Sequence, residues 1–508
     1  VQPVETELGR KRRIDQSACN KDFSCLKGFC PSFVTIEGAV LKKGERRNLA
    51  ATAADLPLPA LPAIEGTYGI VVTGIGGTGV VTIAALLGMA AHLENKGIAA
   101  IDMIGLAQKG GAVLSHLKIA KSPDEIGSPR VAAGGAKVLI GCDQVVAASK
   151  PALATVRAGV TRAVVNLEET FTGDFTRNAD FSFPAERLRR AITRATGEGL
   201  AEFVDGSRIA TGLIGDSIAT NLFMVGFAWQ RGLIPLGLDA LMRAIELNGV
   251  AVAMNQAAFT LGRRAAHDLA AVQAELAPAA HPPAALPADL DGLVARRMAF
   301  LTDYQDRRYA ERYERMVKRA RLVEQTKLGT ETLARTVAEN LFRLMAFKDE
   351  YEVARLWSHP SFQAQLAREF QSTGRLTFHL APPMLAKRDH ATGQLRKSTF
   401  GPWMRQAFRL LRHGKALRFT PFDPFGRTEE RRTERALIGQ YETLVEELLA
   451  GLTPANRALA EELAAIPSRI RGFGHVKERN LQAAKAREAE LLARFRARPE
   501  QPVLVAAE

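Results

Sequence analysis

Three of the four cysteines in this 508-residue chain lie within twelve consecutive positions. Cys19, Cys25 and Cys30 have the spacing C-x5-C-x4-C, and a proline follows the last of them. Thiolates are the usual ligands of iron–sulfur clusters, and closely spaced cysteines let one short loop enclose a cluster. The pattern therefore indicates a metal-binding loop with a [4Fe–4S] cluster as the candidate. Because such a cluster takes four protein ligands, the fourth is expected from chain upstream or from Cys142.

Other interpretations of the cysteine pattern stay open. The spacing matches neither common ferredoxin pattern, so a zinc loop, or plain thiols in a flexible tail, are alternatives. A secreted disulfide framework normally shows an even cluster of cysteines in a short chain, whereas here three cysteines cluster in a chain of 508 residues. Cys142 ends an apolar run, a place where cysteine more often acts as a small core hydrophobe than as a ligand.

A glycine-rich turn at residues 74–79 lies between an apolar run at 68–72, which predicts a buried strand, and a predicted helix over 80–93. The turn fits the pattern G-x-G-x-x-G, in which glycines let backbone amides approach a phosphate and let the helix pack close to the strand. The N-terminus of the helix adds a partial positive charge. The candidate ligand-binding residues of this turn are Gly74, Gly76, Gly77 and Gly79.

A second turn, Gln-Lys-Gly-Gly at 108–111, adds a cation, Lys109, and exposed amides that suit an anion. Asp102 ends the apolar run that follows the first turn, where an acid binds the ribose in NAD sites. NAD is therefore an alternative ligand, and a structural turn without any ligand is another. A phosphate-bearing ligand is the first choice because the glycine turn, the helix N-terminus and Lys109 all favour negative charge.

The first half of the chain alternates strand-like and helical patterns, which predicts an α/β fold with a Rossmann-like parallel sheet. Further strands are expected at 98–101, 112–119, 137–141 and 162–167, and helices at 216–231, 238–247 and 251–264. Ala/Pro-rich segments at 50–64 and 277–289 read as linkers. Beyond the second linker the chain is predicted to be mainly α-helical, with long amphipathic helices over 293–323 and 332–357.

Composition narrows the class of protein. Apolar residues make up 47% of the chain and charged residues 24%, as in ordinary globular proteins. No apolar stretch is long enough to cross a membrane and no secretion signal is recognised, so a cytoplasmic protein is expected. The net charge of +14 raises the question of nucleic-acid binding, but no nucleic-acid-binding motif accompanies it. Such a charge also suits an acidic protein partner or a polyanion such as coenzyme A.

Two segments resemble a known family. Residues 73–97 (TGIGGTGVVTIAALLGMAAHLENKG) and 101–120 (IDMIGLAQKGGAVLSHLKIA) resemble the gamma domain of 2-oxoacid:ferredoxin oxidoreductases. Residues 15–39 (DQSACNKDFSCLKGFCPSFVTIEGA) resemble the iron–sulfur loop of the long, fused indolepyruvate ferredoxin oxidoreductases of bacteria, and the order of the segments also agrees. The helical tail resembles the C-terminal domain of the same fused enzymes.

The resemblance implies a domain division. Residues 1–49 would hold the iron–sulfur loop at the end of a truncated thiamine-diphosphate domain, 65–276 the gamma domain, and 290–508 the helical C-terminal domain. Because the chain begins with Val1 rather than Met, we expect it to be the C-terminal part of a longer protein. The missing upstream half would bind thiamine diphosphate and Mg²⁺ and supply the fourth cluster ligand, so the fragment alone is expected to be inactive.

The resemblance also implies a reaction. An aryl 2-oxoacid such as indolepyruvate would be decarboxylated oxidatively, its acyl group passed to coenzyme A as cosubstrate, and its electrons passed through the [4Fe–4S] cluster to ferredoxin. A homo-oligomer is expected, with no nucleic-acid or membrane partner. The alternative is a non-catalytic electron-transfer or scaffold subunit whose Rossmann-like domain binds NAD or nothing.

Overall fold

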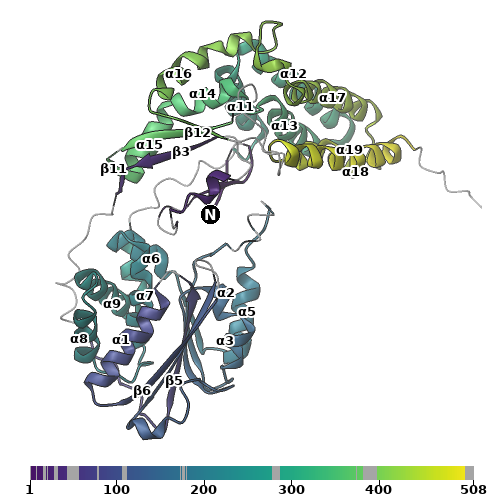
Figure 1. Ribbon diagram of the computed structural model, residues 1–508. Coiled ribbons are helices and arrows are strands. Elements are labelled where there is room, and N and C mark those ends of the chain that lie inside the picture. The colour runs from purple at the N-terminus through teal and green to yellow at the C-terminus, as the bar shows by residue number, and fades with distance from the viewer. Residues whose placement is uncertain are drawn as a thin grey trace, which may run out of the picture. The chain divides into compact units, whose positions relative to one another are not determined.

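The computed structural model describes residues 2–6, 8–14, 16, 19, 21–27, 32–42, 56–76, 79–105, 111–171, 173, 175, 178, 180–276, 287–372, 374–381 and 397–497. The chain forms two compact units, drawn in Figure 1. The first contains Val1–Lys21 and Lys43–Ala284, and the second contains Asp22–Lys42 and Ala285–Glu508. A short antiparallel ribbon at the start of the first unit pairs β1 (Gln2–Val4) with β2 (Lys11–Arg13).

The first unit is built on a six-stranded sheet with the order β10-β9-β8-β5-β7-β6. Strands β5, β8, β9 and β10 are parallel, whereas β7 runs antiparallel to both of its neighbours. The predicted α/β class is confirmed, but the sheet is mixed rather than wholly parallel. The reason is local: only residues 105–111 join β6 to β7, and a parallel connection needs a dozen or more residues. The strands are β5 (Tyr68–Ile75), β6 (Gly97–Ile104), β7 (Ala112–Ala120), β8 (Ala136–Gly141), β9 (Arg162–Asn166) and β10 (Ala201–Val204).

Helices cover both faces of this sheet (Figure 1). One face carries α1 (Val80–Leu93), α7 (Thr220–Gln230), α8 (Leu238–Asn248) and α9 (Val252–His267). The other carries α2 (Gln144–Ala147), α3 (Lys150–Ala154) and α5 (Ala185–Thr196). The shorter α6 (Gly206–Ile214) and α10 (Leu269–Ala274) complete the unit. Predicted helices 216–231, 238–247 and 251–264 therefore correspond closely to α7, α8 and α9.

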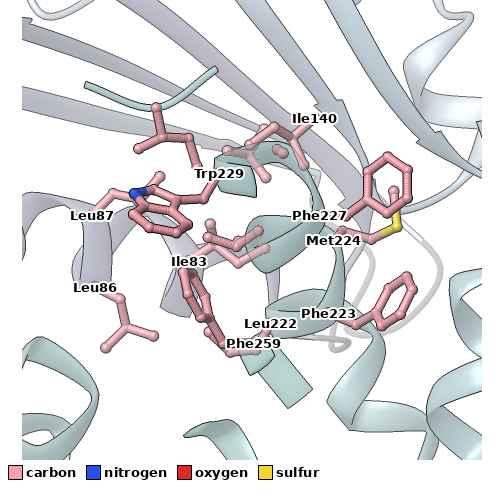
Figure 2. Packing of buried hydrophobic residues seen from close by; sticks show 14 of the residues in the cluster. Ile83, Leu86, Leu87, Ile140, Leu222, Phe223, Met224, Phe227, Trp229 and Phe259 are labelled. Atoms are coloured by element: carbon pink, nitrogen blue, oxygen red, sulfur yellow. The ribbon is translucent and has the colours of Figure 1, made fainter. Parts of the chain in front are cut away.

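The main core lies between the sheet and helices α1, α7 and α9. Figure 2 shows Ile83 and Leu87 of α1 facing aromatic side chains of α7 and α9, including Trp229 and Phe259. Each fully buried side chain of this size contributes about 1.5–3 kcal/mol relative to exposure. Helix α7 is buried along nearly its whole length, which explains why its sequence (TNLFMVGFAWQ) is apolar on all sides.

Helices α7 and α9 touch through two reciprocal glycines. A Cβ atom on Gly226 would overlap the carbonyl oxygen of Phe259, and one on Gly262 would overlap that of Phe223. We expect Gly226→Ala or Gly262→Ala to lower the free energy of unfolding by about 1–3 kcal/mol, because the backbones must move apart. Urea titration would measure this. The matched control is Gly439→Ala, where a Cβ meets no atom within 4 Å, so equal destabilisation there would contradict the explanation.

The second unit is mostly helical, as predicted. Its helices are α11 (Leu290–Tyr304), α12 (Arg307–Leu328), α13 (Thr332–Met345), α14 (Glu350–Ser358), α15 (Pro360–Glu369), α16 (Met404–Leu411), α17 (Glu429–Gly451), α18 (Arg457–Ala464) and α19 (His475–Arg496). The two long helices predicted over 293–323 and 332–357 are each interrupted. Asp306 and Asp349 accept hydrogen bonds from the backbone N–H of Tyr309 and Glu352 and so cap new helices.

Strands from both ends of the chain meet in the second unit. Strand β3 (Ser32–Glu37) pairs antiparallel with β12 (Arg375–Leu380), which also pairs with β13 (Ser398–Phe400). Two short strands, β4 (Val40–Leu41) and β11 (Phe370–Ser372), form a second contact. The segment directly after the cysteine loop is thus built into the C-terminal unit. None of the helices in the described part of the chain combines the length and apolarity needed to span a bilayer.

Candidate functional site

The glycine-rich turn lies at the carboxyl edge of the large sheet, where β5 and β8 are parallel neighbours. Helix α1, which follows β5, covers one face of the sheet, and α2, which follows β8, covers the other (Figure 1). The connections that leave these two parallel strands therefore lead to opposite faces of the sheet. In open α/β sheets, ligands bind outside the carboxyl ends of the strands at such a switch point. The candidate site is accordingly the edge formed by the turn after β5 and the first residues after β8.

Each described glycine of the turn has its own steric role. A Cβ on Gly74 would lie 2.5 Å from Cγ2 of Val80, so this glycine lets α1 pack against the strand. The Gly76 N–H donates to the carbonyl oxygen of Gly111 at 2.7 Å, which joins the turn to the start of β7. Gly79 is the N-cap of α1 with φ 97°, a left-handed conformation that glycine adopts without strain.

The N-terminus of α1 is suited to an anion. Gly79 provides no side-chain oxygen to cap the helix. The Thr82 N–H donates to the Gly79 carbonyl oxygen at 3.1 Å, and the partial positive charge of the helix N-terminus favours an anionic ligand. Gly77 and Lys109, which the sequence also predicts as ligand-binding residues, lie outside the described residues. Their assignment stays a prediction, as does that of the three described glycines.

Asp143 is a buried acid beside the turn. One carboxylate oxygen, Oδ1, accepts the Val146 N–H at 2.8 Å and caps α2. The other, Oδ2, has no hydrogen-bond partner in the described part of the chain and lies 3.7 Å from the Cβ position of Gly74. Burial raises the pKa of Asp143 to about 6, against the opposing effect of backbone hydrogen bonds. The group can therefore donate a hydrogen bond when protonated and repel an anion when ionised.

Sequence reasoning noted Asp143 only as the end of a strand. The available signal was Cys-Asp directly after a buried strand that neighbours the glycine strand, but this neighbourhood depends on strand order. Cys142 itself belongs to the hydrophobic core against α1, and burial raises the pKa of its thiol well above the usual value. The structure thus agrees with its interpretation as a small core hydrophobe.

Asn166 holds the strand ends around the site together. Its Nδ2 donates to the carbonyl oxygen of Cys142 at 3.0 Å and to Oγ of Ser207 at 2.9 Å. Its Oδ1 accepts the backbone N–H groups of Gly206 and Ser207 at 3.0 and 3.3 Å. Because these four bonds are buried, they join β8, β9 and the start of α6 into a rigid frame behind Asp143.

Asp102 does not occupy a ribose-binding position. In dinucleotide sites the acid ends the strand next to the glycine strand, but here β7 lies between β5 and β6, the strand that carries Asp102. The Asp102 carboxylate instead accepts a hydrogen bond from Ser115 on β7. The NAD alternative therefore loses the residue that supported it.

The cysteine loop is described in part. Cys19 is half-buried and its sulfur accepts the Lys21 N–H at 3.4 Å, whereas Cys25 is exposed in a short 3-10 helix. Lys21 and Phe23 have positive φ values of 60° and 56°, which costs energy in non-glycine residues and is typical of functional loops. Cys30 lies outside the described residues. Across the parts of the chain that are described, no three His, Cys, Asp or Glu side chains gather at a metal-like site.

The thiol chemistry of this loop nevertheless suits thiolate ligation. An exposed or half-exposed sulfur is accessible to iron, and an N–H···S hydrogen bond of the kind made by Cys19 tunes cluster potentials in iron–sulfur proteins. The assignment of Cys19, Cys25 and Cys30 as cluster ligands stays a prediction.

The first unit has the features of a Rossmann-like α/β domain: an open, helix-covered sheet with a glycine-rich turn at its switch point. Residues 69–265 match the family described as pyruvate ferredoxin/flavodoxin oxidoreductase. Residues 69–265 are thus similar to that family, and the resemblance predicted from the sequence is confirmed over these residues. Residues 290–490 match a family of unknown function, DUF6537.

The chain is also similar to individual proteins. Indolepyruvate oxidoreductase subunit IorB of Pyrococcus horikoshii is 27% identical over 211 residues, which cover 40% of this chain and 97% of that subunit. The subunit of the same name from Archaeoglobus fulgidus is 25% identical over 185 residues, which cover 35% of this chain and 83% of that subunit. Pyruvate oxidoreductase subunit PORC of Thermotoga maritima has a solved structure that is 19% identical, with a TM-score of 0.30, and the alignment covers 39% of this chain and 97% of that one.

Proposed function

We propose that this chain is part of a coenzyme A-dependent 2-oxoacid:ferredoxin oxidoreductase that acts on an aryl 2-oxoacid such as indolepyruvate. The observation that carries the proposal is the family match over 69–265, together with two relatives that are indolepyruvate oxidoreductase subunits. Thiamine diphosphate and Mg²⁺ would be bound by an upstream half, which would complete a fused, homo-oligomeric enzyme. In this scheme residues 1–49, 65–276 and 290–508 are the iron–sulfur, gamma and C-terminal domains.

We assign Cys19, Cys25 and Cys30 as ligands of a [4Fe–4S] cluster. When bound, such a cluster accepts and releases one electron at a time, which two-electron oxidation of a 2-oxoacid requires before ferredoxin can be reduced. The protein would supply three thiolates within twelve consecutive residues, and the Lys21 N–H donates to the sulfur of Cys19.

We assign the glycine turn to the phosphates of coenzyme A. Gly74, Gly76, Gly77 and Gly79 would expose backbone amides, the N-terminus of α1 would supply positive charge, and Lys109 would add a cation. Asp143 stands beside this turn with a buried oxygen that has no hydrogen-bond partner among the described residues. It would act on affinity through its protonation state, since an ionised carboxylate next to a phosphate is unfavourable.

The purified chain should bind coenzyme A with an affinity that falls as pH rises through about 6, the pKa of Asp143. Ionisation of Asp143 places a negative charge beside the ligand phosphates, so Asp143→Asn should bind roughly tenfold more tightly at pH 7.5, a difference of about 1.4 kcal/mol. At pH 5, where the wild-type acid is protonated, the two proteins should bind alike. Isothermal titration at both pH values measures this.

The same titration separates the proposal from its alternative. Tight binding of NAD with no response to coenzyme A would favour an electron-transfer or scaffold subunit, and binding of neither would favour a purely structural turn. Coenzyme A itself ionises in this pH range. Because the same ligand is titrated into both proteins, its ionisation affects both equally, and the difference between wild type and Asp143→Asn reports on Asp143. An identical pH dependence in the two proteins would remove Asp143 from the site.

A further inference from the structure

The second unit exposes a stripe of large apolar side chains on one helical segment. Helix α16 continues into a 3-10 turn, Arg412–Leu417. Trp403, Leu410 and Leu417 recur along this segment every seven positions, and they are 61%, 77% and 41% exposed. Residues seven apart lie on the same face of an α-helix, which places Trp403 and Leu410 together, and Leu417 ends the 3-10 turn that follows. The opposite face of α16, centred on Phe408, packs into the core of the unit, so the exposed apolar stripe is additional to the one that holds the helix in place.

The same stretch of chain is strongly basic. Between residues 401 and 428 there is one acidic residue, Asp423, against six basic ones: Arg405, Arg409, Arg412, Lys415, Arg418 and Arg427. Two of the six serve the fold: Arg418 pairs with Asp349 in the interior, and Lys415 donates to the carbonyl oxygen of Asp303. The other four form no ion pair with an acidic side chain of the described residues. Their positive charge is therefore available to a partner.

A groove of about 400 Å³ adjoins the stripe. Leu417 accepts the Thr420 N–H at 2.9 Å, and Thr420 begins the groove wall. The single acid in the lining, Asp423, is buried, accepts the Tyr351 hydroxyl at 3.1 Å and pairs with Arg435. The groove is lined by Thr420, Pro421, Asp423, Gly426, Arg427, Arg432 and Arg435.

The outer wall of the groove remains cationic. Arg427 and Arg432 are exposed there and form no ion pair within the described residues; Arg432 donates only to the carbonyl oxygen of Arg427, at 3.0 Å. Phe422, which is 79% exposed, lies in the chain between Pro421 and Asp423 of the groove lining. Large apolar anchors and arginines around a concave surface are the usual composition of protein-binding hot spots.

We propose that this docking surface, made of Trp403, Arg409, Leu410, Leu417, Arg427 and Arg432, binds an acidic protein that carries an apolar patch. The unpaired arginines would steer such a partner and set its orientation, and the apolar side chains would lose their exposed area on binding. A bilayer fits less well, because α16 is short and its other apolar face is already buried. The partner's identity rests on the proposed function, in which the acidic electron acceptor is ferredoxin.

The test uses the full-length enzyme, upstream half included, with 2-oxoacid and two alternative acceptors, an acidic ferredoxin and the small dye methyl viologen. Charge reversal at three arginines (Arg409→Glu, Arg427→Glu, Arg432→Glu) should raise the KM for ferredoxin about tenfold or more and weaken its dependence on salt, when rates are divided by the viologen rate of the same preparation. The control is Arg479→Glu, an exposed arginine on α19 (His475–Arg496), which lies far from α16 in Figure 1.

A second variant tests the apolar stripe: Trp403→Ala with Leu410→Ala should also raise the KM for ferredoxin, without changing its salt dependence. An unchanged KM in both variants overturns the docking surface even if viologen is reduced normally. If the wild-type enzyme reduces neither acceptor, the proposed function fails, and direct titration of ferredoxin into wild type and charge-reversal variant still decides the docking surface. If the charge-reversal variant binds ferredoxin like wild type but loses binding to phosphatidylserine vesicles or to inorganic pyrophosphate, the surface binds those ligands and the proposed protein docking is overturned.

Discussion

Replacing Cys19 or Cys25 by serine in the full-length enzyme is expected to remove the bound iron and reduce ferredoxin reduction to roughly one hundredth or less. The loss should exceed the 10–100-fold effect of changing groups that only support a metal ligand, since each variant removes a thiolate that would contact iron directly. Iron and sulfide content, visible absorbance and electron paramagnetic resonance after anaerobic reconstitution measure the cluster independently of activity.

The matched control for these variants is Cys142→Ala. This thiol is buried in the core against α1, so its loss should cost stability but leave iron content unchanged. If Cys142→Ala also loses iron, Cys142 is the fourth ligand and the expectation of an upstream ligand is wrong. If Cys19→Ser and Cys25→Ser both retain iron, sulfide and a reducible spectrum, the cysteine loop does not hold a cluster.

The strand–turn–helix at the site could be predicted because its signals are local. Apolar residues, closely spaced glycines and a helical pattern follow one another directly, and the structure gives β5, the turn and α1 at nearly the predicted positions. The role of Asp143 could not be predicted in this way. It depends on β8 lying next to β5 and on β7 being inserted between β5 and β6, and strand order is decided by pairings far apart in the sequence.

In the second unit, too, local features could be predicted from the sequence and long-range pairings could not. The helical character of residues 290–496 followed from amphipathic patterns, but the ends of the helices did not. Asp306 and Asp349 each precede a new helix, and an aspartate at such a position is a recognised signal for a helix start. The prediction from amphipathic patterning did not use this signal and therefore ran across both helix starts. The pairing of β3 with β12 joins residues more than 300 positions apart. No local pattern in either strand identifies the other as its partner.

The capping residue Asp349 also carries the largest stability prediction. Its carboxylate receives two hydrogen bonds from Arg418, at 2.7 and 2.8 Å, and both side chains are almost wholly buried. Arg418 further donates to the carbonyl oxygen of Tyr304 at 2.8 Å and to Gln305 at 2.9 Å, and its guanidinium lies 3.9 Å from the Tyr304 ring centroid. The pair therefore joins α11, the start of α14 and the turn after the 3-10 segment Arg412–Leu417.

Asp349→Ala should lower the free energy of unfolding of the second unit by about 3–5 kcal/mol, because it leaves a buried guanidinium without its counter-charge. Loss of the α14 cap adds about 1 kcal/mol. The double variant Asp349→Leu with Arg418→Met should recover most of this loss, since it removes both charges and fills the space with apolar atoms. As a surface control, Glu311→Ala breaks an exposed pair with Arg307 and should change stability by less than about 1 kcal/mol. Denaturant titration of all four proteins decides the matter: if the double variant is as unstable as Asp349→Ala, the penalty comes from lost packing or capping rather than from an uncompensated charge.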